Sequence, residues 1–235
     1  MKKIPIAIST FHDGSAGQIS EWLESVSNFR IVCYFTSQPY QRIDPLLENT
    51  KRVSRKMEYP TSSTYRDKPL YWGSGWVKKI KKHAVKTVLP IDPDNRCRWA
   101  TIQLCHKNGL SLASAIHPSA MIMPKTSIAD GVWIHAKAQI GYKTDISEGT
   151  IINSGSIIEH HNVLKSCVQI DPGVITTGGC TVLERGHVHT GAVLINKVVV
   201  GRDAQVGAGS LVRRNVPDSS IVVGIPAKEL KKRNK

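Results

Sequence analysis

A six-residue repeat runs without interruption through the second half of the chain. Beginning at Ile116, every sixth residue up to Val212 is Ile, Leu or Val in sixteen of seventeen positions, and Thr176 is the exception. Four residues after each of these lies a second series, from Ala120 to Val216, whose members are mostly small or β-branched. An α-helix repeats about every 3.6 residues and a strand every two, so neither accounts for this period.

The period predicts a β-solenoid in which each hexad forms one flat face. The aliphatic residue of the hexad points inward, and the small residue four places on lets the chain turn the corner. If three hexads close a coil, one coil takes 18 residues, and successive coils stack at the strand spacing of about 4.8 Å. The period by itself fixes neither the hand of the solenoid nor its number of faces.

The beginning of the chain has the pattern of an α/β unit. Residues 4–8 and 29–35 are typical strands. Between them lie a turn at 11–17 and a helix whose apolar residues recur at helical spacing, namely Ile19, Trp22, Leu23 and Val26. A strand, a glycine-bearing turn, a helix and a second strand make a βαβ unit, whose first turn often holds phosphate or a nucleotide.

The segment that follows is less regular. Residues 38–75 show no clear period and are expected to form a long irregular segment. A strand at 85–91 and a helix at about 96–107, capped by Asp92 or Asp94, precede the repeat.

Charge is the unusual feature of the composition. Lys and Arg number 32 against 18 Asp and Glu, which gives a net charge of +14 and favours an acidic partner, such as nucleic acid, anionic lipid or a phosphorylated small molecule. The densest basic run, at 76–83, is more typical of a solvated helix face than of a nucleic-acid stripe. No apolar run approaches the roughly 18 residues of a membrane span. The five scattered cysteines, without a CxxC pair, fit a reducing cytosol.

The end of the repeat carries a further signature. Residues 206–228, from Val-Gly-Ala-Gly-Ser-Leu-Val to Gly-Ile-Pro-Ala-Lys, resemble the segment that ends the coils in CoA-dependent hexapeptide-repeat acyltransferases. The resemblance implies left-handed coils with three faces, acetyl-CoA as the acyl donor, and a CoA site beside this end of the solenoid. A simple cap over the last coil is the alternative.

The order of the elements is similar to one branch of that superfamily, the bacterial sugar acetyltransferases of the sialic-acid O-acetyltransferase and nucleotide-linked 4-amino-sugar N-acetyltransferase type. The resemblance implies a mainly β protein: a small Rossmann-like α/β domain at 1–112 that binds the acceptor, then a left-handed parallel β-helix of hexapeptide repeats at 113–235, with a C-terminal tail. The family's glycine-rich first turn is replaced here by Phe-His-Asp-Gly-Ser at 11–15. The candidates for binding the acceptor there are Asp13, Gly14 and Ser15.

Acyl transfer from a thioester needs a general base and donors for the oxyanion, but no covalent nucleophile. The segment 157–163 resembles the family's Glu-His stretch, in which the His is the base, and this resemblance maps the base onto His160. On the period alone, His160 is no better a candidate than three other histidines of the repeat, namely His161, His187 and His189. The amino-sugar members place an acidic residue directly after the base, whereas this chain has His161.

The same resemblance implies further site residues. Gly178 matches a position whose backbone amide meets the thioester carbonyl, one coil from His160. The other matched positions that bind acyl-CoA are Gln169, Thr190 and Ala208, and the position near the acceptor is Asn153. Ordinary corner packing is the alternative for Thr190 and Ala208.

Four functions remain open on the sequence. The first is acetyl-CoA-dependent N-acylation of a nucleotide-linked amino-deoxysugar by direct transfer, with His160 as the base. The second is O-acetylation of a sialic acid or a related sugar hydroxyl. The third, a γ-type metal hydratase, needs three converging histidines, and the fourth is a non-catalytic solenoid scaffold, against which the CoA-type segment argues.

We adopt the first function and expect no metal cofactor. We also expect a cytoplasmic homotrimer, with neither nucleic acid nor a membrane as partner. The apolar outward residues that suit a subunit interface are Ile175, Val193 and Val199.

Overall fold

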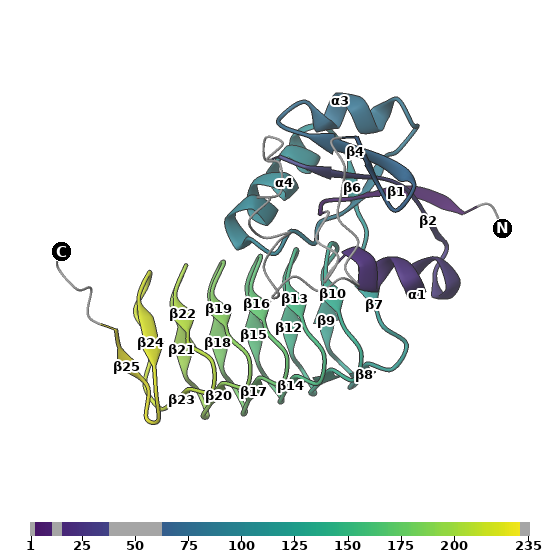
Figure 1. Cartoon of the computed structure of the whole chain (residues 1–235). Coiled ribbons are helices and arrows are strands. Elements are labelled where there is room, and N and C mark those ends of the chain that lie inside the picture. Colours follow the sequence, from purple (N-terminus) through teal and green to yellow (C-terminus); the bar gives the residue numbers. More distant parts are fainter. Residues whose placement is uncertain (1–2, 11–15, 38–62, 231–235) are drawn as a thin grey trace, which may run out of the picture. The chain divides into compact units, whose positions relative to one another are not determined.

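The computed structural model describes residues 3–10, 16–37 and 63–230 (Figure 1). It divides into two units, Met1–Ala113 and Ser114–Lys235, so the boundary lies one residue after the position expected from the sequence. The first unit is an α/β sheet and the second a parallel β-solenoid, as the sequence predicts. No helix within the described ranges is long and apolar enough to span a membrane.

The first unit alternates short strands and helices. In chain order its elements are β1 (Ile4–Ile8), α1 (Gln18–Val26), β2 (Phe29–Thr36), β3 (Thr64–Tyr65), β4 (Lys68–Trp72), α3 (Trp76–Lys81), β5 (Thr87–Leu89), α4 (Asn95–Lys107) and β6 (Ser111–Leu112). Its described strands form a sheet in the order β3-β4-β2-β1-β5-β6, with only the β3–β4 pair antiparallel. β1 therefore has β2 on one side and β5 on the other, which is the arrangement of a doubly wound sheet.

Local sequence signals account for most of these elements. In α1, Ile19 and Leu23 are buried as expected, but Val26 is 49% exposed at the end of the helix. Asp94 caps the start of helix α4, where its side chain accepts a hydrogen bond from the backbone N–H of Cys97 at 2.8 Å. Such a cap contributes about 1 kcal/mol.

The basic run 76–83 forms helix α3. Trp76 and Ile80 are buried, whereas the lysines of the helix are exposed. The run is thus a helix with an exposed basic face.

The expectation of an irregular segment at 38–75 was wrong for residues 63–75, and residues 38–62 lie outside the described residues. β3 and β4 both lie within it, and β4 pairs in register with β2, so that Tyr34 faces Leu70 and Thr36 faces Trp72. Pairing with a distant strand stabilises β4, and that pairing leaves no period in the local sequence.

The second unit consists of very short strands joined by turns. They are β7 (Ala115–Ile116), β8 (Met121–Ile122), β9 (Ser127–Ile128), β10 (Trp133–Ile134), β11 (Gln139–Ile140), β12 (Asp145–Ile146), β13 (Ile151–Ile152), β14 (Ile157–Ile158), β15 (Val163–Leu164), β16 (Gln169–Ile170), β17 (Ile175–Thr176), β18 (Thr181–Val182), β19 (His187–Val188), β20 (Val193–Leu194), β21 (Val199–Val200), β22 (Gln205–Val206), β23 (Leu211–Val212), β24 (Ile221–Val223) and β25 (Lys228–Glu229).

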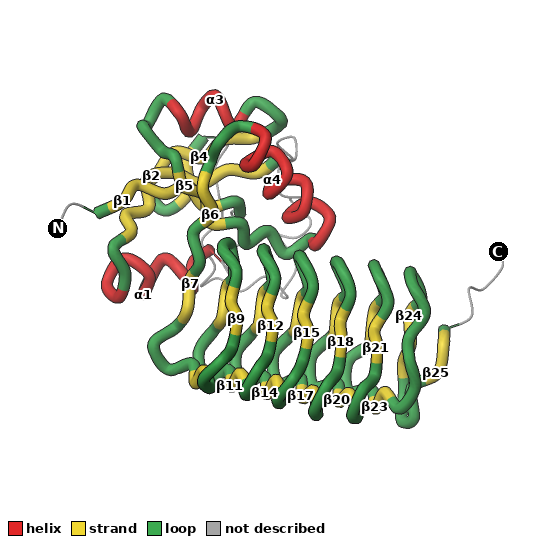
Figure 2. Tube along the Cα trace, turned by 180° about the vertical axis from the view of Figure 1, so that it is seen from behind, coloured by secondary structure: helices red, strands yellow, loops and turns green. Residues whose placement is uncertain are grey.

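These strands stack into three sheets, which are the three faces of the solenoid (Figures 1 and 2). We call them the β13 face (β7 to β25 through β13), the β14 face (β8 to β23 through β14) and the β15 face (β9 to β21 through β15). Ile151 pairs with Trp133 on one side and Gln169 on the other, so one coil takes the 18 residues that the hexads predict. At the last coil Gln205 pairs with Ile221, which makes that coil two residues shorter.

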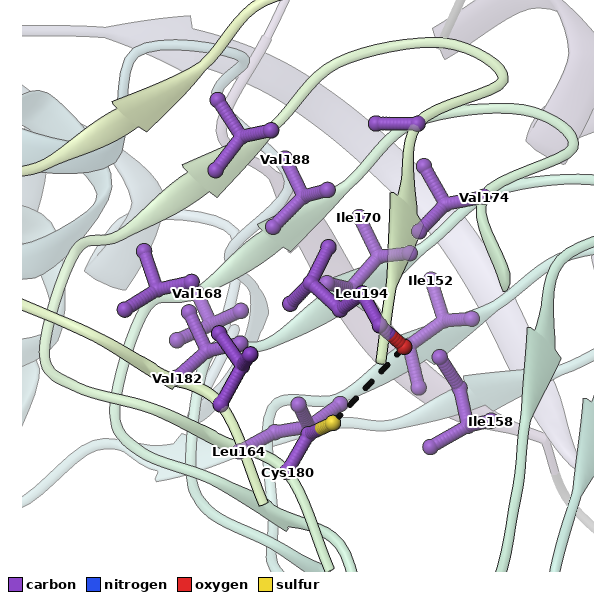
Figure 3. Close-up of a cluster of buried hydrophobic side chains, with 14 of the residues drawn as sticks. Ile152, Ile158, Leu164, Val168, Ile170, Val174, Cys180, Val182, Val188 and Leu194 are labelled. Atoms are coloured by element: carbon purple, nitrogen blue, oxygen red, sulfur yellow. Dashed lines mark hydrogen bonds between the residues drawn. The ribbon is translucent and has the colours of Figure 1, made fainter. Parts of the chain in front are cut away.

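The aliphatic series fills the interior of the solenoid (Figure 3). From Ile134 to Val212 each of its members is at most 2% exposed. Ile116 and Ile122 are both 37% exposed, because they belong to the first coil and no coil precedes it. Full burial of one such side chain is worth about 1.5–3 kcal/mol, so the stack of coils is the main source of stability in this unit.

The small-residue series lies at the corners of the solenoid, where several of its side chains donate hydrogen bonds to backbone carbonyls. Thr144 Oγ1 donates to the carbonyl of Glu159 on the next coil at 3.1 Å. The same bond to a carbonyl fifteen residues on, at 3.0–3.1 Å, is made by Thr150, Ser156, Asn162 and Cys180. A buried polar side chain is tolerated at these corners because it has such a partner.

Candidate active site

The turn at 159–162 joins β14 to β15 and carries two adjacent histidines. Both imidazoles are exposed, and their Nδ1 atoms lie 2.9 Å apart, with the rings nearly perpendicular at 86°. One of the two Nδ1 atoms must carry the hydrogen of this bond. His161 has a left-handed backbone (φ 58°), and its ring meets Tyr142 edge-on at 5.8 Å.

The carboxylate that resembling enzymes place beside the base has no equivalent in this turn. Glu159 lines the same cavity as His160, but it forms no hydrogen bond with either imidazole. Within the part of the chain that the structure describes, His161 is the side chain that bonds His160.

Two glycines enclose the His160 segment on the neighbouring coils. A Cβ placed on Gly178 would lie 2.5 Å from Cε1 and 2.8 Å from Nε2 of His160, so the imidazole packs directly on the Gly178 backbone. A Cβ on Gly141 would lie 2.6 Å from the backbone N of His160. The N–H of Gly178 has no acceptor among the described residues and is free to bind a ligand. The structure therefore brings His160 and Gly178 together, as the sequence predicted.

A cavity of about 300 Å³ opens beside this imidazole. It is lined mainly by apolar residues of the first coils on the β14 face, and its titratable groups are His160, Glu159 and the phenol of Tyr142. The other lining residues are Met121, Met123, Gln139, Ile140, Gly141, Tyr142, Ile157 and Ile158. The walls of the cavity suit a small acyl group or a deoxysugar, and the imidazole of His160 can accept a proton there.

Two of the CoA candidates occupy a different edge of the solenoid. Thr190 and Ala208 are exposed turn residues on successive coils, and the N–H of Gly209 bonds the carbonyl of Thr190 at 2.9 Å. These turns lead from the β13 face to the β14 face, whereas His160 lies where the β14 face meets the β15 face. A single chain therefore does not bring Thr190 and Ala208 to His160.

The remaining two candidates lie on the β13 face. Asn153 donates from its side-chain amide to the carbonyl of Ile170 at 3.1 Å. Gln169 donates from Nε2 to Asp171 Oδ1 at 3.0 Å. Both amides are thus held in fixed orientations, but neither contacts His160.

Sequence reasoning missed a cluster on the β13 face. Asp171 Oδ2 accepts hydrogen bonds from His187 Nε2 at 2.9 Å and from His189 Nδ1 at 3.1 Å. Burial alone would raise the pKa of Asp171, but the hydrogen bonds from His187 and Gln169 and the two nearby imidazoles lower it below its usual value. The signal was present in the sequence, because His189 follows Asp171 by one coil and His187 shares its face.

A second cavity of about 300 Å³ lies at the C-terminal end of the solenoid. It is lined by Arg213, Arg214, Pro226, Ala227 and Lys228. Three cationic side chains around one hollow favour a phosphorylated ligand. This is the segment that resembles the CoA-flanking end of the acyltransferases.

In the first unit, polar residues gather where β1 and β5 end. Ser9 follows β1, and its Oγ accepts a hydrogen bond from the N–H of Ile91 at 3.1 Å. Asp92 is only 8% exposed, and burial raises the pKa of its carboxyl group to about 6. The candidates Asp13, Gly14 and Ser15, which follow β1, lie outside the described residues.

Comparisons with known proteins place the fold. No protein-family model matches the chain. A variant of perosamine N-acetyltransferase from Caulobacter crescentus, solved with CoA and GDP-perosamine, is 23% identical, has a TM-score of 0.80 and aligns over 99% of both chains. The acetyltransferase domain of PglB from Neisseria gonorrhoeae FA1090, solved with acetyl coenzyme A, is 23% identical with a TM-score of 0.76, over 97% of this chain and 100% of that one. The chain has the fold of these acetyltransferases.

The hexapeptide-repeat acetyltransferase fold expected from the sequence is thereby confirmed over almost the whole chain. A shorter likeness is to the serine acetyltransferase of Bacillus pumilus (strain SAFR-032), which is 46% identical over 48 residues. That match covers 20% of this chain and 22% of the enzyme, so the chain spans about a fifth of the length of this curated relative.

Proposed function

We propose that the protein transfers the acetyl group of acetyl-CoA to the amino group of a nucleotide-linked amino-deoxysugar. The observation that carries the proposal is the His160 imidazole, which packs on the backbone of Gly178 and lines an apolar cavity. The likeness in fold to acetyltransferases that bind CoA supports it. Release of free CoA thiol from acetyl-CoA in the presence of such a sugar tests it, and no release with any amino sugar would contradict it.

The chemistry requires one base and one oxyanion donor. The neutral amine attacks the thioester carbonyl, a C–N bond forms, and His160 takes the proton that the nitrogen loses. The free N–H of Gly178 stabilises the oxyanion of the tetrahedral intermediate. The C–S bond then breaks, and the imidazolium returns its proton to the departing thiolate, so that CoA leaves as the thiol.

The C-terminal cavity is the proposed site for the phosphates of CoA. Arg213, Arg214 and Lys228 supply the positive charge, and guanidinium groups bind phosphate through paired hydrogen bonds. Gln169, Thr190 and Ala208 remain proposed contacts along the pantetheine arm and the acyl group. Because the last two lie on another edge from His160, this arrangement needs residues from two copies of the chain.

The first unit is the proposed binding site for the acceptor. In open α/β sheets, ligands bind at the carboxyl ends of the strands where the strand order reverses. Here that position is the end of β1 and β5, beside Ser9 and the carboxyl group of Asp92. Asp13, Gly14 and Ser15 are proposed to contact the nucleotide phosphates. Asn153, in the second unit, is a separate proposed contact to the acceptor.

We also propose that three copies of the chain assemble through the β14 face. Its outward column is apolar except at Gln139, which lies between Met121 and Ile157. In this column Met121 is 50% and Ile175 is 36% exposed, and Val193 lies beside Ile175. Val199, which the sequence analysis grouped with them, lies on the β15 face instead. The column runs into the cavity beside His160, so a second copy on this face would cover the site.

Light scattering should return about three times the 25.9 kDa of one chain. Ile175→Asp should lower the mass of the particle, because it places a charge in the proposed interface. Val199→Asp is the control on the other face and should leave the trimer intact. A monomer at working concentration, or equal loss of assembly in both variants, would rule this interface out.

A further inference from the structure

The cluster on the β13 face has the composition of a metal site. Its three groups are one carboxylate and two imidazoles, and their donor atoms all lie within 4.8 Å of one another. They come from neighbouring coils, with Asp171 after β16 and His187 and His189 at β19. None of them belongs to the site around His160.

The strand geometry explains why the two imidazoles converge. Residues two apart in an extended chain point to the same side, and Val188 between them points into the core, where it is fully buried. The rings of His187 and His189 consequently stand side by side, with centroids 3.8 Å apart. The coil that precedes them places Asp171 next to both rings.

We propose that Asp171, His187 and His189 form a binding site for a divalent transition-metal ion, with Zn²⁺ as the best fit. Two imidazoles and one carboxylate are a common ligand set for zinc, with a fourth position left to water. Bond lengths of about 2.0–2.2 Å place tetrahedral ligands roughly 3.3 Å apart. The contacts of 2.9 and 3.1 Å between Asp171 Oδ2 and the two nitrogen atoms are close to that separation.

Metal binding changes which nitrogen of each imidazole carries the hydrogen. In the structure His187 Nε2 and His189 Nδ1 each donate a hydrogen to the carboxylate. When the ion binds, the hydrogen of each neutral ring moves through solvent to the other ring nitrogen, so that the nitrogen facing Asp171 presents its lone pair to the metal. One carboxylate then offsets half of the charge of the ion.

The surroundings of the carboxylate suit this role. Gln169 Nε2 donates to Asp171 Oδ1, which fixes the carboxylate and leaves Oδ2 for the ion. The three side chains are 16–33% exposed, so an ion can enter from solvent. On the next coil, the position after the strand is Gly207, which has no side chain to cover His189.

This proposal revises the expectation of no metal and does not depend on the proposed acyl transfer. The full-length protein, without an affinity tag, is stripped with a chelator and titrated with Zn²⁺ against a chromophoric competitor. We expect one Zn²⁺ per chain and a rise in melting temperature. Binding of Co²⁺ should give the strong visible absorption of a four-coordinate ion.

Three variants separate this site from adventitious binding. Gln169→Leu should weaken Zn²⁺ binding by about 10–100-fold, the usual cost of losing a partner that orients a ligand. Asp171→Asn and His187→Gln should weaken it further, since each removes a ligand. His117→Gln is the matched control, because His117 lies in the same column of the β13 face, away from the cluster.

Circular dichroism of the metal-free variants checks that each is folded. The proposal stands if only the cluster variants lose the ion. It is wrong if wild-type protein binds Zn²⁺ no more tightly than the Asp171→Asn variant. It is also wrong if His117→Gln loses as much affinity as His187→Gln, or if the stoichiometry is one ion per three chains.

Discussion

Replacing His160 by Ala should lower kcat for acetyl transfer by about 10²–10⁴-fold, the usual contribution of a well-placed general base. The KM for acetyl-CoA should change little, because the imidazole acts on the acceptor proton in the transition state. Steady-state rates on variants checked for folding provide the measurement. Turnover near that of the wild type would end the assignment of His160 as the base.

His161 is the natural control for this prediction. Its Nδ1 bonds Nδ1 of His160, so it positions the base without taking the substrate's proton. His161→Ala should therefore cost less than His160→Ala. His161→Glu should raise turnover, because a carboxylate there can accept the Nδ1 hydrogen of His160 and increase the basicity of Nε2. A loss in His161→Ala as large as that in His160→Ala would mean that the two imidazoles act as a unit.

Gly178→Ala should lower kcat by about 100-fold while the solenoid stays folded. The added Cβ would lie 2.5 Å from Cε1 of His160, so the ring must move, and a shift of about 1 Å at a reacting group has roughly this cost. The φ of Gly178 is not in the left-handed region, so Ala brings no backbone strain. Rates and melting temperatures are measured together, to separate loss of catalysis from loss of stability.

A double variant shows whether the Gly178 effect passes through the imidazole. In the His160→Ala background there is no ring to displace, so Gly178→Ala should cost little more. Gly75→Ala, at a glycine with nothing within 4 Å of the added Cβ, is the control for the substitution itself. A full 100-fold loss on top of His160→Ala would show that Gly178 acts independently of His160.

The solenoid could be predicted from the sequence because its order is local and repeated. Each inward residue, such as Ile152 or Leu164, sits at a fixed place in a six-residue unit, and the sheets follow from stacking those units. Strand β4 was missed because its partner, β2, lies more than thirty residues earlier. Pairing at that distance leaves no mark on the local pattern.

The candidate site was predictable only in part. The 18-residue coil places Gly178 beside His160, so that contact could be foreseen from the numbering. The same rule placed Asp171 below His189, but the meeting of Asp171 with His187 depends on side-chain directions that the period does not give. The same numbering separates Thr190 from His160, because their spacing of 30 residues is not a multiple of 18, and the order of the faces shows that they lie on different edges.

The central claim is transfer of an acetyl group to a sugar amine, and product analysis tests it most directly. The protein is incubated with acetyl-CoA and a panel of nucleotide-linked sugars that carry either an amino or a hydroxyl group at the same carbon. Release of free CoA thiol is followed with a colorimetric thiol reagent, and the products are identified by mass spectrometry and NMR. We predict an acetamido sugar from at least one amino substrate, none from its hydroxyl counterpart, and a loss of both signals in His160→Ala. Acetylation of the hydroxyl sugars alone would contradict the account, and so would a failure of acetyl-CoA to react with any acceptor in the panel.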